Sequence, residues 1–335
     1  MPETSLRHAV DDYLGPGGKR FFSAGYRRVG YHFGPLVADV RSEHDADVTT
    51  SVGLTYPADW SKKLTDTDLR PHLSTIDAIL LGVQLAEACV VRTFRLDPAA
   101  HRTLWVRRVR IRAGRAPEED LTELPLAGRL TGTGAGTALP VVSVVDCRVG
   151  AMRVRCEIEH PGGAAHPGHD LLPSLDTLLG PAKNRYYGSG FTRGAHRIDD
   201  LELNLGDLIA TANVDLTDAN TTQGAEAAYT PAPTMVDAFA TGLQLAQILL
   251  YELDGMHRRD SNTLWMRTTT LTSTSPHRTF RAALPLRTRL ANTRLVEMNE
   301  GVWRTADILT EFAGVAFTCG VTHALPHGSR NQEIP

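Results

Sequence analysis

Residues 74–94 read STIDAILLGVQLAEACVVRTF, and the prediction of the fold rests on them. Its first residues form a capping box, in which the Ser74 side chain is positioned to accept a hydrogen bond from the Asp77 amide and to start a helix. From Ile76 to Phe94 the residues are apolar on nearly every side, and a helix of this kind is normally buried. The sequence therefore predicts a long central helix that other elements enclose.

The same helix occurs a second time. Residues 234–253 read TMVDAFATGLQLAQILLYEL and repeat the capping box, the Asp and the Gln at an offset of 160 positions. Solenoid repeats are only about 20–50 residues long. The period is that of a domain, so the chain is predicted to be a fused pseudo-dimer with a site at the seam between its halves. Further landmarks recur in the same order at offsets of 160 to 165: Leu14-Gly15-Pro16 with Leu179-Gly180-Pro181, Arg20-Phe21-Phe22 with Arg185-Tyr186-Tyr187, Thr103-Leu104-Trp105 with Thr263-Leu264-Trp265, Pro125-Leu126 with Pro285-Leu286, and Cys156 and His160 with Cys319 and His323.

Strands are predicted on both sides of each central helix, where β-branched and aromatic residues lie between turn formers. Strands, one buried helix and then consecutive strands indicate the α+β class. The pattern resembles the hot-dog arrangement, an antiparallel sheet wrapped around a helix, so two copies predict a double hot-dog fold. The predicted strands are 26–34, 48–56, 103–111, 140–147 and 152–160 in the first half, and 263–271, 284–290, 303–309 and 315–323 in the second.

The repeat also gives the domain boundaries. The first repeat is expected at residues 1–160 and the second at 177–325, followed by a tail at 326–335. Residues 161–176 are expected to be a linker, because they begin with a run of Pro, Gly and Ala. The sequence leaves open whether the protein is a monomer or a homodimer.

Composition and motifs exclude several classes of function. The 335 residues are 42% hydrophobic and 22% charged, as in ordinary globular proteins. A net charge of −3 gives no reason to expect a nucleic-acid partner. The four cysteines lack CxxC spacing, and HExxH, GxSxG, P-loop and dinucleotide patterns are missing, so no metal is expected. No signal peptide or membrane span is expected, and the predicted location is cytoplasmic.

Polar residues inside the two buried helices are the first candidates for chemistry. Asp77, Gln84 and Glu87 lie at i, i+7 and i+10, on one stripe of the helix. In one interpretation the stripe is a pocket wall, where Asp acts as general acid or base and Gln orients a carbonyl group. In the other, Asp only caps the helix and Gln binds strand backbone. The second helix repeats the stripe with Asp237, Gln244 and Gln247, and the two potential sites differ because His72 and Glu87 correspond to Ala232 and Gln247. The residues predicted to be catalytic are Asp77, Asp237, Gln84, Gln244 and His72.

An arginine on an apolar strand face is the second candidate. If side chains alternate along residues 105–111, Arg107 lies on the inner face with Trp105, and Arg267 lies beside Trp265 in the second half. An inward Arg needs an anionic partner, either the helix Asp or a phosphate or carboxylate of a substrate. Asn262, just upstream, is either an added donor or part of a turn at the start of the strand.

Two weaker signals complete the candidates. Arg185 and Tyr187 follow a Gly-Pro turn, where the Tyr is either a packing residue or a hydroxyl donor to a substrate oxyanion. Arg108, Arg110 and Arg112 form an outward basic strip. Such a strip is either solvated or a docking site for an acidic acyl-carrier protein or for the phosphates of coenzyme A.

Several stretches resemble the avirulence protein D (AvrD) family over almost the whole chain. The family is associated with syringolides, which are acyl glycosides built from a β-ketoacyl thioester and a pentulose. A more distant likeness is to the AfsA-type enzymes of γ-butyrolactone signalling. The stretches that carry the resemblance are residues 71–78, 250–254 and 262–267, together with 13–16, 150–152 and 303–308.

The resemblance implies a biosynthetic enzyme that joins a β-ketoacyl thioester to a sugar hydroxyl. Coenzyme A or an acyl-carrier protein would bear the acyl group as substrate, and no cofactor is implied. On this hypothesis Asp77 or Asp237 takes the hydroxyl proton, while a helix N-terminus stabilises the thioester oxyanion. Two alternatives stay open: an acyl-thioester dehydratase or thioesterase, although the dehydratase HxxxGxxxxP pattern is missing, and a non-catalytic protein that binds an acyl lactone.

Overall fold

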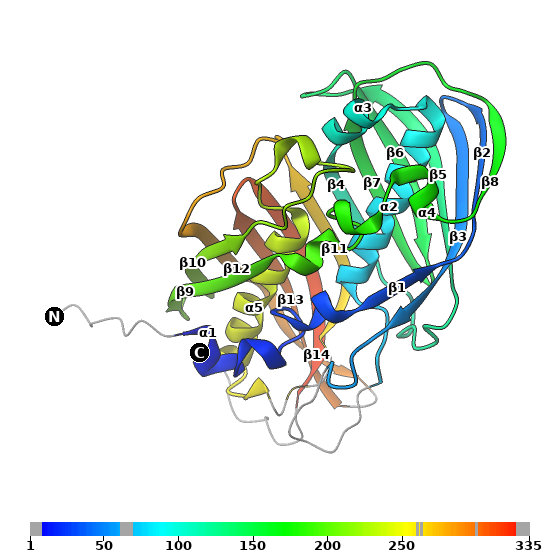
Figure 1. Cartoon of the computed structure of the whole chain (residues 1–335). Coiled ribbons are helices and arrows are strands. Elements are labelled where there is room, and N and C mark those ends of the chain that lie inside the picture. The colour runs from blue at the N-terminus through cyan, green and yellow to red at the C-terminus, as the bar shows by residue number, and fades with distance from the viewer. Residues whose placement is uncertain (1–8, 61–69, 259–260, 262–263, 299–300, 326–335) are drawn as a thin grey trace.

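The computed structural model describes residues 9–60, 70–258, 261, 264–298 and 301–325. Two long helices, α2 (Thr75–Phe94) and α5 (Met235–Leu253), each lie inside a curved antiparallel sheet (Figure 1). The predicted α+β double hot-dog fold is confirmed, and both helices begin within one residue of the predicted position. None of the helices in the described part of the chain is long and apolar enough to cross a membrane.

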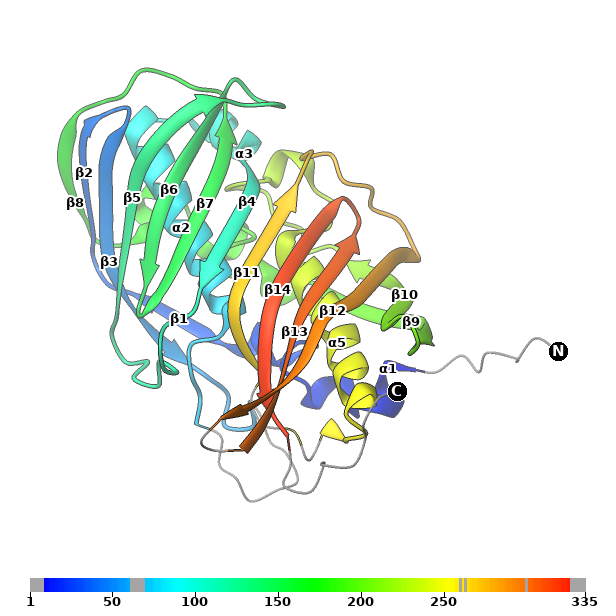
Figure 2. The ribbon, with the colours of Figure 1, turned by 180° about the vertical axis from the view of Figure 1, so that it is seen from behind.

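All the strands in the described part of the chain belong to one sheet. Its order is β8-β2-β3-β5-β6-β7-β4-β11-β14-β13-β12-β10-β9, with β1 paired to β3. The two halves join where β4 and β11 run antiparallel, with Ile111 opposite Thr269 (Figure 2). The strands of the first half are β1 (Gly30–Phe33), β2 (Leu36–Ser42), β3 (Asp45–Thr55), β4 (Trp105–Arg112), β5 (Leu124–Ala135), β6 (Val141–Val149) and β7 (Met152–His160). The remaining strands are β8 (Gly168–Leu172), β9 (Ala195–Asn204), β10 (Ile209–Thr217), β11 (Trp265–Ser273), β12 (Leu284–Met298), β13 (Gly301–Phe312) and β14 (Val315–Ala324).

The central helices are held very close to the sheet. All twenty residues of α2 are buried. A Cβ atom on Gly82 would lie only 2.6 Å from Val154 Cγ1, and one on Gly242 would lie 2.6 Å from Thr310 Cγ2. Only glycine fits a contact this close, so the repeated Gly82 and Gly242 set the helix-to-sheet distance in both halves.

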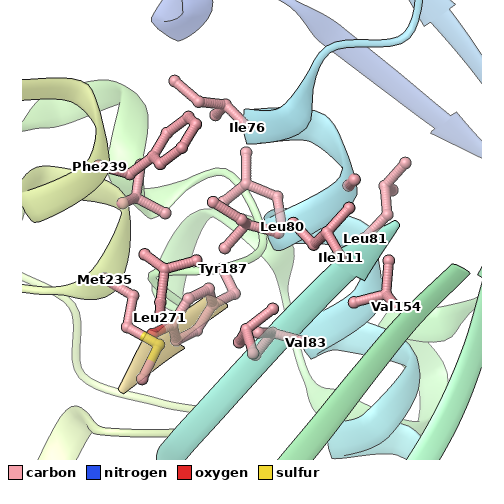
Figure 3. Close-up of a cluster of buried hydrophobic side chains, with 14 of the residues drawn as sticks. Ile76, Leu80, Leu81, Val83, Ile111, Val154, Tyr187, Met235, Phe239 and Leu271 are labelled. Atoms are coloured by element: carbon pink, nitrogen blue, oxygen red, sulfur yellow. The ribbon is translucent and has the colours of Figure 1, made fainter. Parts of the chain in front are cut away.

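The hydrophobic core is continuous across the seam. Side chains of α2, including Ile76 and Leu80, gather with Phe239 and Met235 of α5 and with Leu271 of β11 (Figure 3). All five side chains are fully buried. The two halves therefore share one core, and burial at their interface contributes to the stability of both.

Short helical segments are exchanged between the halves. The first half opens with α1 (Val10–Leu14), η1 (Gly17–Lys19) and η2 (Gly25–Arg28), but α1 packs against α5 of the second half. The second half opens with α4 (Leu175–Leu179), η3 (Ala182–Asn184) and η4 (Gly190–Arg193), and α4 packs against α2 (Figure 1). Each half thus covers the central helix of the other. Two further short helices are α3 (Pro98–Thr103) and η5 (Ala227–Tyr229).

The stretch predicted to be a linker contains a strand. β8 pairs with β2, with Leu36 opposite Leu172, and extends the sheet of the first half. The Arg92 side chain of α2 also forms an ion pair with Asp170 of β8. The Pro and Gly composition thus marks only the beginning of the connection, at residues 161–167, while the predicted tail lies outside the described residues.

Candidate functional site

A cavity lies at the seam, at the N-terminus of α2. It offers about 140 Å³ of space for the centres of water molecules and draws its walls from both halves. Most of the walls are apolar or aromatic, and the charged side chains in the lining are Arg20, Arg258 and Glu118. The lining residues are Arg20, Phe21, Phe22, Trp60, His72–Thr75, Ala113, Gly114, Ala116–Glu118, Ala151 and Met152 from the first half, and Gln247, Tyr251, Arg258 and Leu264–Met266 from the second.

The start of α2 supplies a positive pole to this cavity. Ser74 Oγ accepts from the Asp77 amide at 3.2 Å, and Asp77 Oδ2 accepts from the Ser74 amide at 2.8 Å, as the capping box predicts. The amides of Thr75 and Ile76 precede the first intrahelical bonds and make no hydrogen bond within the described ranges. Because α2 is twenty residues long, these amides carry the partial positive charge of its dipole.

Two arginines add full positive charge. Arg20 is 8% exposed, and its Nη2 donates to Asp11 Oδ1 at 2.7 Å. Its Nε and Nη1 have no hydrogen-bond partner among the residues that the structure describes. Burial lowers the pKa of Arg20, and the nearby Arg258 lowers it further, while Asp11 opposes both effects. Burial also lowers the pKa of Arg258. Two partly desolvated cations at one wall favour an anionic ligand between them.

His72 is the histidine in this cavity. Its ring packs edge-on against Trp60, with centroids 5.3 Å apart. His72 Nδ1 lies 3.3 Å from the carbonyl oxygen of Arg70, which can only accept a hydrogen bond. In neutral His72 the proton is therefore on Nδ1, and Nε2 is left with a free lone pair to accept a proton. Among the five residues predicted to be catalytic, His72 alone lines the cavity.

Asp77 lies away from the cavity. Its carboxylate is fully buried and accepts hydrogen bonds from Tyr31 Oη at 2.5 Å, from Tyr56 Oη and from Ser74. Burial raises the pKa of Asp77, while the bonds from Tyr31, Tyr56 and Ser74 oppose this rise. The contacts correspond to the capping interpretation, in which the carboxylate fixes the start of α2 to two tyrosines.

The other polar residues of the helix stripes also bind protein groups. Asp237 caps α5 through the Thr234 amide at 2.9 Å. Gln84 Oε1 lies 3.4 Å from Arg185 Nη1, and Gln244 Nε2 donates to the Phe22 carbonyl oxygen at 3.1 Å. None of the three lines the cavity at α2, although Asp237 borders a small hollow beside Thr234.

The predicted inward position of Arg107 and Arg267 is wrong. A β-bulge shifts the register between Val106 and Arg108, and a matching bulge lies between Met266 and Thr268. A bulge adds one residue to the strand and breaks the alternation of faces. Arg107 therefore turns outward and binds Glu157 at 2.6 Å, and Arg267 is exposed.

The remaining predicted binding residues are divided between the two sides of the seam. Trp265 lines the cavity at α2, whereas Trp105 is fully buried and does not reach it. Arg185 and Tyr187 are buried on the opposite side of the pseudo-twofold axis. Asn262 lies outside the described residues.

That opposite side is the counterpart of the cavity, and ion pairs fill it. Arg185 corresponds to Arg20 and is 1% exposed. It binds Asp176 at 2.8 Å and lies 3.8 Å from Glu87, the counterpart of Gln247. Glu87 also contacts His101 Nε2 at 2.6 Å and accepts from the Ala225 amide at 2.8 Å. Although burial favours its neutral form, His101 and Arg185 hold the pKa of Glu87 below its ordinary value.

A second ion pair also fills this side of the seam. Glu226 Oε2 lies 2.7 Å from Arg278 Nη2 and accepts from Tyr187 Oη at 3.2 Å. Glu226 Oε1 accepts from the Val106 amide at 3.1 Å. These groups occupy the place that the cavity has in the other half. Within the described residues, no group of His, Cys, Asp or Glu side chains is arranged to hold a metal ion.

Several cavity residues were not predicted from the sequence. The sequence indicated Arg20 only as a repeat landmark, Gln247 only as part of a helix stripe and Tyr251 only within a stretch that carries the family resemblance, and it gave no prediction for Arg258. The signal for Arg20 is its counterpart Arg185, because a repeated arginine after a repeated Gly-Pro turn indicates a shared position. Arg258 has no such signal.

Comparison with known proteins identifies the family. The model of the Pseudomonas avirulence D protein (AvrD) family matches residues 5–326. The chain belongs to the AvrD family. No curated protein is significantly similar to the chain in sequence.

Solved structures with low identity are similar in fold. One is a conserved hypothetical protein from Mycobacterium tuberculosis described as having a double hot-dog fold, with 11% identity, a TM-score of 0.40, and coverage of 76% of this chain and 82% of that one. GphF Dehydratase 1 has 13% identity, a TM-score of 0.40, and coverage of 86% and 96%. The pyran synthase domain from module nine of the sorangicin pathway has 13% identity, a TM-score of 0.36, and coverage of 86% and 97%.

Proposed function

We propose that this AvrD-family protein is an enzyme acting on acyl thioesters, and that it joins a β-ketoacyl thioester to a hydroxyl group of a ketose. The observation that carries the proposal is the cavity at the start of α2. It combines apolar walls, free helix amides, a histidine, the buried cation of Arg20 and the half-buried cation of Arg258 in one place. These are the groups that acyl transfer to a polar acceptor requires.

The apolar walls suit the acyl chain. Phe21, Phe22 and Met152 offer carbon surface on which a fatty chain is removed from water. A thioester bound beside Thr75 places its carbonyl oxygen near the free amides at the start of α2. These amides would stabilise the negative charge that develops on that oxygen during attack.

His72 is proposed as the general base. Its Nε2 takes the proton of the ketose hydroxyl as the hydroxyl oxygen attacks the thioester carbon. The new C–O bond forms, the C–S bond breaks, and the departing thiolate receives the proton from His72. The products are an acyl ester and a free thiol, so atoms and charge balance without an oxidant or a metal.

Arg20 and Arg258 are proposed to hold an anionic group of one substrate. Within the described residues, Nε and Nη1 of Arg20 have no hydrogen-bond partner, and these donors suit an oxyanion. A phosphorylated ketose or the enolate of the β-ketoacyl group carries such charge.

The test is incubation of the purified protein with a β-ketoacyl-coenzyme A and a panel of ketoses and ketose phosphates, read by mass spectrometry and by thiol release. Acyl ester and thiol should form together and only with an acceptor present. His72→Gln should lower kcat about 10²- to 10⁴-fold while the melting temperature stays unchanged. Thiol release at the same rate without any acceptor would instead identify a thioesterase and overturn the proposal.

A further inference from the structure

An arginine ladder crosses the outer face of the sheet in the first half. Arg148 of β6 lies opposite Arg153 of β7, and Arg153 lies opposite Arg112 of β4. One pleat along, Arg155 lies opposite Arg110. The five side chains are exposed. Their neighbour Val154 points inward onto Gly82 of α2, so the ladder lies on the side of the sheet away from the helix. Figure 2 shows β6, β7 and β4 from the side on which they lie in front of α2.

This arrangement places like charges next to each other. Directly opposed residues on antiparallel strands have Cβ atoms about 4.5–5.5 Å apart, and like charges there are destabilising. Arg155 is offset by Asp146 at 3.1 Å. The other four arginines make no ion pair or side-chain hydrogen bond with any residue in the described ranges. Within the described residues, the positive charge of Arg110, Arg112, Arg148 and Arg153 is therefore not compensated, and Arg155 alone has an acidic partner.

The fold does not require these arginines, because the second half lacks them. At the matching positions Thr272 lies opposite Ala316, and Glu311 lies opposite Ala316 on its other side. Thr270 and Thr318 form the second matching pair. The same sheet geometry is thus built without the like-charge contacts, and the ladder calls for an explanation outside the fold.

The ladder adjoins the cavity along the chain. Ala113 and Gly114 line the cavity and directly follow Arg112, while Ala151 and Met152 line it and directly precede Arg153. The half that carries the ladder is also the half whose strands lead to the open cavity. An anion bound on the ladder would lie at the edge of the site proposed for the thioester.

We propose that the arginine ladder, Arg110, Arg112, Arg148, Arg153 and Arg155, docks an acidic carrier protein that presents the acyl thioester to the cavity. The inference rests on the proposed function, since it names the form in which the thioester arrives. A sheet face suits a protein surface better than a nucleotide, because small ligands bind in concave pockets. A carrier surface rich in Asp and Glu complements the ladder and accelerates encounter.

The experiment compares two forms of one β-ketoacyl group. The wild type, an Arg112→Gln/Arg148→Gln/Arg153→Gln variant and a control variant are assayed with β-ketooctanoyl-coenzyme A and with a bacterial acyl-carrier protein of the fatty-acid synthesis type, loaded with the same group. The control is Arg287→Gln/Arg289→Gln/Arg294→Gln, which removes the same charge from exposed positions on β12. Direct binding of the loaded carrier is measured by calorimetry at low and at physiological salt.

The ladder variant is expected to raise KM and Kd for the loaded carrier at least about tenfold, with a weaker dependence on salt, and to leave KM for the coenzyme A thioester within about twofold. The control should match the wild type in every assay. Equal carrier binding by all three proteins overturns the inference. An equally large rise of KM for the coenzyme A thioester in the ladder variant also overturns it, because the ladder would then be a phosphate site. Because calorimetry needs no turnover, carrier binding that depends on the ladder would support docking even if no ester formed and the proposed function failed.

Discussion

The two sides of the seam are built from corresponding elements and differ in what occupies them. At the start of α2, Arg20 faces a cavity beside Gln247. At the matching place near α5, Arg185 meets Glu87, and Glu226 binds Arg278. The duplicated fold makes the two positions equivalent, and a few charged side chains decide whether a position becomes an open site or is closed by buried ion pairs.

Breaking the buried ion pairs of Glu87 should have the largest effect. Glu87→Gln keeps the shape of the side chain but removes the buried charge that Arg185 and His101 face. We expect a loss of about 3–5 kcal/mol in the free energy of unfolding, because breaking a buried ion pair leaves its partners uncompensated. Urea denaturation of both proteins measures the change.

The matched substitution in the open site is Gln247→Ala, which removes no charge. Its cost should stay below about 1 kcal/mol. If Glu87→Gln and Gln247→Ala lower the free energy of unfolding equally, the buried ion pairs do not distinguish the closed side from the open side.

The next largest effect should be on the pH dependence of stability. Burial lowers the pKa of His160 to about 4, whereas its ordinary value is 6.5. The ring Nδ1 accepts from the Gly162 amide at 3.2 Å, and Nε2 lies 2.8 Å from Ser143 Oγ, a pattern that suits the neutral ring. Between pH 6.5 and 4 the unfolded chain binds a proton at this histidine that the folded protein does not. Stability should fall as pH drops through that window, by at most about 3 kcal/mol.

His160→Gln removes this contribution, so its unfolding free energy should depend less on pH between 6.5 and 4 than that of the wild type. The exposed His44 provides the control, and His44→Gln should leave the curve unchanged. The counterpart of His160 in the second half is His323, which lies 3.2 Å from Asp254 Oδ2 instead of a serine hydroxyl. Parallel curves for wild type and His160→Gln would contradict the prediction.

A substitution that makes the open side resemble the closed side should change ligand affinity more than it changes stability. Gln247→Glu supplies the carboxylate that Glu87 provides on the other side, where it lies 3.8 Å from Arg185. An internal anion near Arg20 competes with any anionic ligand. Affinity for a ketose phosphate, measured by calorimetry, should fall about 10- to 100-fold, the value of one or two charged hydrogen bonds.

The melting temperature of Gln247→Glu should stay the same or rise, because the new carboxylate can form an ion pair with the desolvated Arg20. Gln247→Leu has a similar volume without the charge and should bind the phosphate within about fivefold of the wild type. Unchanged affinity in Gln247→Glu would place the anion site elsewhere.

The smallest effect should be the same on both sides. Ser74→Ala and Thr234→Ala each remove the side-chain cap of a central helix, and in both caps the hydroxyl accepts from the Asp amide at 3.2 Å. Thr234 Oγ1 also lies 2.7 Å from Tyr186 Oη. Each should cost about 1 kcal/mol in thermal or urea denaturation. A much larger cost at Ser74 would show that the cap of α2 also supports the cavity wall.

Elements with local causes could be predicted from the sequence. The capping boxes and all-round apolar composition placed α2 and α5, and β7 has its predicted bounds. β9 and β10 were missed because β9 reads AHRIDDLELN, whose charged residues hide the strand pattern at the edge of the sheet. Arg107 was misplaced because a β-bulge leaves no mark in an alternating pattern.

The site was harder to predict because its parts are far apart in the chain. Arg20 and Arg258 meet only after the second half has folded against the first, and no local pattern links them. The closing residues Glu226 and Arg278 come from loops whose composition gives no sign of burial. His72 and Trp265 were reached through comparison of the repeats, which tells where halves differ but not which half is open.

The exchanged opening segments also bear on how such a chain can be taken apart. A cut at Gly162-Gly163 would leave an N-terminal fragment that carries α1, the cover of α5, and a C-terminal fragment that carries α4, the cover of α2. Neither fragment holds the parts needed to finish its own interior. The two halves of the duplicated protein thus depend on each other, and a substitution in one half affects the stability of the other.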